Sequence, residues 1–155
     1  SDDDYASFIE EESDQKIPEG NFVTPDGKIL GRHKGIIHYT IGQRKGLGLS
    51  LGYQAFVLEI RPDTNEVVIG TNEDLMTTRV RANKLNFMTV EDLEGEMRVF
   101  AKIRYNHKGD WCTVRKTGED EIECIFETPQ RAVTPGQALV LYDGDYVLGG
   151  GTILG

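Results

Sequence analysis

The sequence lacks the features that mark membrane, secreted and metal-binding proteins. No apolar run approaches the roughly 18 residues that a membrane-spanning helix needs, so no membrane span is expected. The N-terminus is acidic and polar, which argues against a signal peptide. Only two cysteines occur, Cys112 and Cys124, and neither has metal-type spacing or a partner histidine. We therefore expect a cytoplasmic protein in a reducing environment, without a metal site.

The sequence also lacks a recognisable catalytic centre. A nucleophile beside a base, paired carboxylates or a metal cluster would indicate one, and none is visible. Two glycine-rich stretches, residues 46–52 and 148–155, resemble phosphate loops superficially. The first lacks the Gly-Lys-Ser/Thr ending and the second is followed by no helix, so close strand packing or a tight bend is expected in the second. We expect Cys112 and Cys124 to be structural thiols, because reactive thiols need basic neighbours or a helix N-terminus.

Acidic residues are missing from one part of an otherwise acidic chain. The formal net charge is −9, and residues 1–26 hold nine acids and one lysine, yet residues 27–58 hold no acid. Histidines 33 and 38 lie in this acid-free run, together with five cations: Lys28, Arg32, Lys34, Arg44 and Lys45. A solvated loop can have this composition by chance, and a local anion-binding surface is the alternative. Composition does not separate the two.

Short strands and turns dominate the pattern that is present. The chain has 155 residues and 18 glycines, which fits one domain or two small ones with many turns. A short helix is predicted over residues 2–13, where Tyr5, Phe8 and Ile9 fall on one side. The Pro-Asp-Gly sequence at residues 25–27 predicts a turn between two extended segments. Residues 53–60 and 66–70 predict a hairpin.

Six further strand candidates follow at the spacing of a barrel or sandwich, over residues 81–88, 97–105, 111–116, 121–127, 137–143 and 146–154. The sequence therefore predicts a mainly β protein with a short N-terminal helix. We expect a small β-rich central domain over residues 1–76 and a closed antiparallel β-barrel over residues 77–155.

One stretch of the predicted barrel, residues 102–108, interleaves basic and aromatic side chains. It reads KIRYNHK and includes Lys102, Arg104, Tyr105, His107 and Lys108. This mixture suits phosphate contact and base stacking in RNA recognition. Arginine and tyrosine are also common at strand ends, so the pattern alone does not establish RNA binding.

Three longer strings resemble one family. GKILGRHKGIIHYTIGQRKGLG (27–48), KIRYNHKGDWCTV (102–114) and AVTPGQALVLYDGDYVLGGGTI (132–153) resemble, in order, the C-terminal half of the bacterial tRNA-specific 2-thiouridylases. The resemblance implies a PP-loop ATP-binding domain, a central domain and a β-barrel. It implies an enzyme that adenylates the wobble uridine (U34) of tRNA with ATP. A cysteine persulfide then transfers sulfur to C2 and forms 2-thiouridine.

The family's SGGxDS and CFI segments, which carry its ATP signature and one catalytic cysteine, are not among these residues. The chain is therefore expected to be the noncatalytic part, inactive and without a cofactor by itself, packed on an ATP domain. The resemblance implies tRNA, through its anticodon arm, and a sulfur-donor protein as partners of the full-length enzyme. By the same resemblance Arg104, Tyr105 and Gln137 match tRNA-contacting positions.

Arg44 and Lys45 suit phosphate contact as well. Two alternatives stay open. The chain can be a free-standing β-barrel adaptor that binds RNA or a protein, or its basic loop can pack on another domain and touch no RNA.

Overall fold

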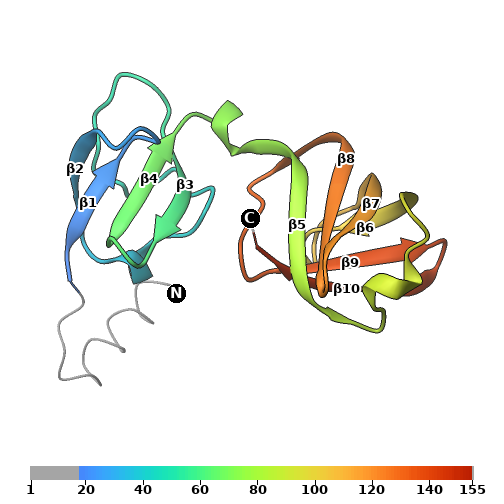
Figure 1. Ribbon diagram of the computed structural model, residues 1–155. Coiled ribbons are helices and arrows are strands. Elements are labelled where there is room, and N and C mark those ends of the chain that lie inside the picture. The colour runs from blue at the N-terminus through green and yellow to red at the C-terminus, as the bar shows by residue number, and fades with distance from the viewer. Residues whose placement is uncertain (1–17, 155) are drawn as a thin grey trace. The chain divides into compact units, whose positions relative to one another are not determined.

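The structure, a computed structural model, describes residues 18–154, and these residues divide into two units between Leu75 and Met76 (Figure 1). Strands dominate both units, as the sequence predicted. The helix predicted over residues 2–13 lies outside the described residues.

The first unit is built on a four-stranded sheet. Its strands are β1 (Gly20–Val23), β2 (Ile29–His33), β3 (Phe56–Arg61) and β4 (Glu66–Gly70), in the order β2-β1-β4-β3. The predicted turn at residues 25–27 and the predicted β3–β4 hairpin are both present. The central pair, β1 and β4, is parallel. Parallel strands need a long crossover, so no local pattern in the sequence indicated this pairing.

The acid-free run supplies part of the core of this unit. Tyr39 and Leu47, which follow the short 3₁₀ helix η1 (Ile36–His38), are buried with Phe22 of β1. The rings of Phe22 and Tyr39 meet edge to face at 5.2 Å. His33 is also buried: its Nδ1 accepts the N–H of Gly35 at 2.9 Å, and its Nε2 donates to the carbonyl of Asn65 at 2.7 Å. The run is thus only partly a solvated surface.

The second unit is a closed antiparallel barrel, which confirms the predicted fold. Its strands are β5 (Met76–Asn86), β6 (Met97–Lys102), β7 (Asp110–Gly118), β8 (Glu121–Arg131), β9 (Ala138–Asp143) and β10 (Tyr146–Ile153). They close in the order β10-β5-β8-β7-β6-β9. Short 3₁₀ helices, η2 (Glu73–Leu75) and η3 (Val90–Asp92), precede β5 and β6.

Alternation along each strand separates the barrel core from its outer wall. Val99 and Ala101 of β6 point inward with Cys112 and Val114 of β7, and residues between them are more exposed. The glycines of β10 allow close approach, because a Cβ at Gly150 would lie 2.1 Å from the carbonyl oxygen of Leu139. The close packing expected at this glycine-rich stretch is therefore confirmed, and a phosphate loop is not formed there.

Candidate RNA-contacting surfaces

The barrel brings three predicted tRNA-contacting residues to one of its ends. Arg104 and Tyr105 lie in the loop that follows β6, and Gln137 lies directly before β9. β6 and β9 are antiparallel, with Lys102 opposite Val140, so the end of β6 and the start of β9 are at the same end of the barrel. This juxtaposition joins residues more than 30 positions apart in the sequence.

Arg104 is oriented by the backbone and has donors to spare. It is half-buried, and its Nη1 donates to the carbonyl oxygen of Arg131 at 3.1 Å. Within residues 18–154 it forms no salt bridge. Since a guanidinium has five N–H donors, the remaining ones suit a phosphate. The adjacent Tyr105 side chain is 96% exposed, and Gln137 is exposed as well.

His107 is an acceptor in the same loop rather than an additional cation. Its Nδ1 accepts the N–H of Ile103 at 3.4 Å. Burial lowers the pKa of His107, and the neighbouring positive charge of Arg104 lowers it further. The ring is therefore neutral at neutral pH, and the positive charge of the loop comes from Arg104 and the lysines beside it.

The outer wall beside this loop holds side chains that the sequence analysis did not single out. They are Arg98 and Phe100 of β6, Trp111 of β7 and Tyr142 of β9. The sequence feature that could have identified part of this group is the alternation within residues 97–105. It places Arg98, Phe100 and Lys102 on one face of a strand. Knowing which rings lie beside them required the strand order.

Arg44 and Lys45 lie on an ordered loop of the first unit. The Gln43 side chain closes the turn, since its Oε1 accepts the N–H of Thr40 at 3.0 Å and its Nε2 donates to the carbonyl of Lys45 at 2.9 Å. Backbone hydrogen bonds join Gly42 and Gln43 to Val57 at 2.8 and 2.9 Å. Arg44 and Lys45 are exposed, and Arg44 lines a hollow of about 270 Å³ with residues 46–49 and 53–55. The loop therefore presents two cations to solvent.

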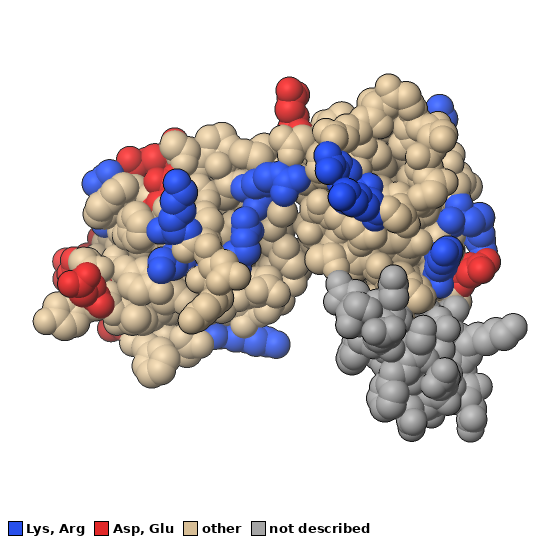
Figure 2. Space-filling model, turned by 180° about the vertical axis from the view of Figure 1, so that it is seen from behind, with Lys and Arg blue, Asp and Glu red and all other residues tan. Residues whose placement is uncertain are grey.

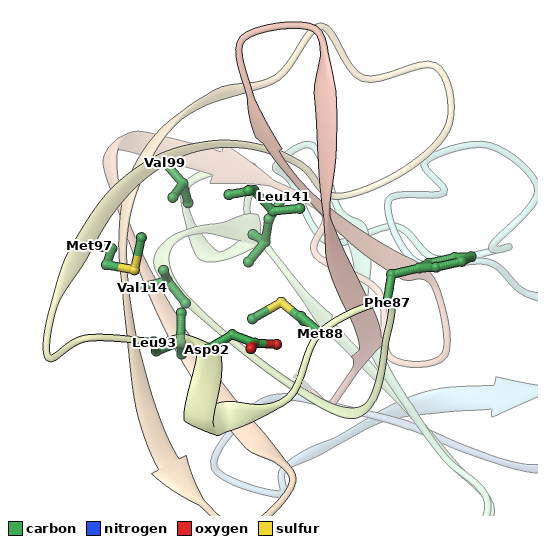
Figure 3. Close-up of a pocket in the computed structure, with 9 residues that line it drawn as sticks. Phe87, Met88, Asp92, Leu93, Met97, Val99, Val114 and Leu141 are labelled. Atoms are coloured by element: carbon green, nitrogen blue, oxygen red, sulfur yellow. The ribbon is translucent and has the colours of Figure 1, made fainter.

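A second hollow, of about 270 Å³, lies in the barrel, at the end opposite the Arg104 loop, and is apolar (Figure 3). Its lining side chains are those of Phe87, Met88, Asp92, Leu93, Met97, Val99, Val114, Leu141 and Leu148. The one carboxylate, of Asp92, accepts the N–H of Thr89 at 2.7 Å as a cap of η3. The Phe87 ring points away from the hollow. Nothing in this lining combines the groups that catalysis requires.

Neither cysteine is placed for chemistry. Cys112 and Cys124 are buried in the barrel core, and a hydrogen bond from one thiol to the other, together with burial, raises the pKa of Cys124.

Among residues 18–154 no three or more His, Cys, Asp or Glu side chains are grouped to hold a metal ion. In the same part of the chain, no helix is long and apolar enough to cross a bilayer.

We expect both thiols to be unreactive and dispensable. A thiol reagent should modify the native chain far more slowly than the denatured chain, because both thiols are fully buried and a reagent reaches them only when the barrel opens. Cys112→Ala and Cys124→Ala should keep the native fold and lose only modest stability, as urea unfolding would measure. Failure of either variant to fold would contradict this.

Comparison with known proteins first gives the class of the two units. The family model of the tRNA methyl transferase PRC-barrel domain matches residues 6–71. The family model of the aminomethyltransferase β-barrel domain matches residues 77–153. The chain thus has a PRC-barrel domain followed by a β-barrel domain.

Curated relatives then identify the family. The chain is 66% identical to a tRNA-specific 2-thiouridylase of Lachnoclostridium phytofermentans, over 99% of this chain and 43% of the relative. It is 49% identical to tRNA-specific 2-thiouridylases of Koribacter versatilis and Clostridioides difficile, over 97% and 98% of this chain and 42% of each relative. The chain belongs to the tRNA-specific 2-thiouridylase family. It spans less than half the length of these relatives.

Proposed function

We propose that this chain is the noncatalytic, tRNA-contacting part of an enzyme that converts the wobble uridine of tRNA to 2-thiouridine. The observation that carries the tRNA contact is the shared barrel end. Arg104 has free donors there, Tyr105 presents almost its whole side chain to solvent, and Gln137 lies at the same end. The relatives' printed name, tRNA-specific 2-thiouridylase, supports tRNA as the substrate.

The described residues do not fit ATP. Residues 46–52 lead through a loop into strand β3, and residues 148–153 of the second glycine-rich stretch lie within strand β10. Neither glycine stretch opens a helix whose N-terminal N–H groups would receive phosphate. We infer that ATP and the persulfide cysteine belong to another domain of the full-length enzyme and that this chain alone is inactive. In this proposal, a sulfur-donor protein delivers sulfur to the full-length enzyme in the cytoplasm.

The first unit contributes to tRNA binding without recognising a particular base. Arg44 and Lys45 are exposed on the loop that Gln43 closes, and no carboxylate within residues 18–154 pairs with them. Two such cations give electrostatic attraction to the anticodon arm without reading its sequence. Packing of this loop on the ATP domain is the competing role.

The test of the tRNA site is Arg104→Ala in the full-length enzyme. We expect tRNA binding to weaken by about 1–3 kcal/mol, the usual scale for a hydrogen bond to a charged group. The salt dependence of binding should become shallower, because one fewer phosphate is neutralised, and ATP affinity should stay unchanged. The measurement is tRNA affinity at several salt concentrations.

Two variants control this experiment. Arg104→Lys keeps the charge but loses the planar donor set, so it should recover the salt slope and only part of the affinity. Lys116→Ala removes an exposed cation of β7 far from the Arg104 end, and it should bind tRNA almost as wild type does. Equal affinities and slopes for wild type and Arg104→Ala would remove Arg104 from the tRNA site.

A further inference from the structure

The row of cations that ends at Arg104 begins further back on β6. Arg98, Phe100 and Lys102 occupy alternate positions of this strand, facing away from the core side chains Val99 and Ala101. Alternate positions of a strand point to the same side of the sheet and lie roughly 6.8 Å apart. Two cations, Arg98 and Lys102, therefore lie on the outer wall of the barrel and lead toward the Arg104 loop.

Aromatic rings lie between these cations. Phe100 pairs with Trp111 of β7 on one side and with Tyr142 of β9 on the other. The Phe100 and Trp111 rings meet edge to face at 5.5 Å. The Arg98 guanidinium lies 4.1 Å from the centroid of the Trp111 ring, and the Lys102 ammonium lies 5.5 Å from that of Tyr142. We call these five residues, Arg98, Phe100, Lys102, Trp111 and Tyr142, the β6 wall.

The carboxylates beside this wall are already engaged. Glu127 accepts two hydrogen bonds from Arg98, at 2.7 and 3.0 Å. Asp110 accepts from the backbone of Trp111 at 2.8 Å and from the side chains of Thr128 and Gln130. Within residues 18–154 Lys102 forms no salt bridge. Its ammonium is therefore the cation of the wall that is free to meet an external anion.

Exposure of the wall is consistent with an external partner. The Trp111 side chain is 41% exposed although it is large and apolar, and Arg98 and Phe100 hold one of its faces and its edge. β6 and β7 lie behind β5 and β8 in Figure 1, and the view from behind in Figure 2 shows Lys and Arg side chains, with some Asp and Glu side chains, on that side of the barrel. The half-exposed Trp111 ring and the Lys102 ammonium lie on the same outer face, on either side of Phe100. Such a ring and a cation on one face suit a base or ribose and a nearby phosphate of one strand.

We propose that the β6 wall is a second RNA-contact surface, continuous with Arg104 and Tyr105, that takes the phosphate–ribose backbone of the bound tRNA. Lys102 contacts a phosphate, and the exposed part of Trp111 packs against the adjoining ribose or base. Arg98 is a positioning residue, since it holds the Trp111 ring and neutralises Glu127. This inference rests on the proposed function, in which the protein acts on tRNA.

The experiment uses the full-length enzyme and measures tRNA affinity against salt for Lys102→Ala and Trp111→Ala. Lys102→Ala should weaken binding about five- to tenfold and reduce the magnitude of the salt slope by roughly 0.7–0.9, the value for one phosphate contact. Trp111→Ala should weaken binding at least about fivefold with an unchanged slope, because stacking neutralises no charge. Lys116→Ala is the charge-matched control, and melting temperatures verify folding. If Trp111→Ala does not fold, Trp111→Leu replaces it.

The outcomes separate the two proposals. If Arg104→Ala weakens tRNA binding while Lys102→Ala and Trp111→Ala bind as wild type does, the β6 wall is not an RNA surface and the proposed function stands. If Lys102→Ala loses no more affinity than Lys116→Ala, its effect is general charge, and the wall is again overturned. Unchanged tRNA affinity together with loss of sulfur delivery from a donor protein would assign the wall to a protein partner instead. Weaker tRNA binding by both Lys102→Ala and Trp111→Ala, with a shallower salt slope for Lys102→Ala alone, supports the inference.

Discussion

Replacing Gly150 with alanine is expected to destabilise the barrel by about 3 kcal/mol or more, because the new methyl group has no room. Its Cβ would lie 2.1 Å from the carbonyl oxygen of Leu139. That atom belongs to the backbone of β9, which pairs with β10, so relief requires the two strands to separate. Urea unfolding of wild type and Gly150→Ala, followed by a probe of the barrel, measures the difference.

Gly118→Ala is the matched control for Gly150→Ala. Gly118 also lies in a barrel strand, and a Cβ there would meet only the Cβ of Glu121 at an ordinary 3.4 Å. We expect this variant to be close to wild type in stability, or slightly more stable, because alanine restricts the unfolded chain. Similar urea-unfolding midpoints for the two variants would show that β9 and β10 can move apart at little cost in stability.

Phe22→Ala is expected to unfold the first unit and leave the barrel folded. Phe22 is 1% exposed and packs edge to face on Tyr39 and His33, at 5.2 and 5.8 Å. Truncating a buried phenylalanine costs about 3–5 kcal/mol, which is comparable to the whole stability of so small a unit. Hydrogen exchange should show lost protection in β1–β4 and retained protection in β5–β10.

Phe22→Ala should also affect the loop that carries Arg44 and Lys45, because the core around Phe22 supports this loop. Tyr39 and Leu47 pack in the same cluster as Phe22, so the loop carrying Arg44 and Lys45 should lose its order with the core. The control is Ile29→Ala in the same sheet, because Ile29 is 62% exposed and its truncation leaves no cavity. Loss of protection in both units at once would show that they unfold together.

Local sequence patterns determined most of the secondary structure. The turn at residues 25–27, the β3–β4 hairpin and the six barrel strands all follow from turn residues and period-two alternation. The main boundary differences are at β5, which begins at Met76 instead of residue 81, and at β8, which continues to Arg131. Strand ends depend on partners, so a single strand's sequence indicates them poorly.

The resemblance to a family came from strings of residues, and the family comparisons confirm it. It named Arg104, Tyr105 and Gln137 but gave no account of how positions so distant in the chain come to lie at the same end of the barrel. Antiparallel pairing of β6 with β9 supplies that reason, because it places the end of one strand beside the start of the other. Their contact with tRNA stays a prediction.

By itself the sequence determined the kind of fold, the family and the uneven charge of the chain. Only the tertiary structure decided which members of the acid-free run are core and which are surface: His33 and Tyr39 are buried, whereas Arg44 and Lys45 are exposed. It also decided the parallel pairing of β1 with β4 and the placement of the Tyr142 ring beside Lys102. These features depend on contacts between segments far apart in the chain, and alternation or turn propensity within one segment carries no information about its partner.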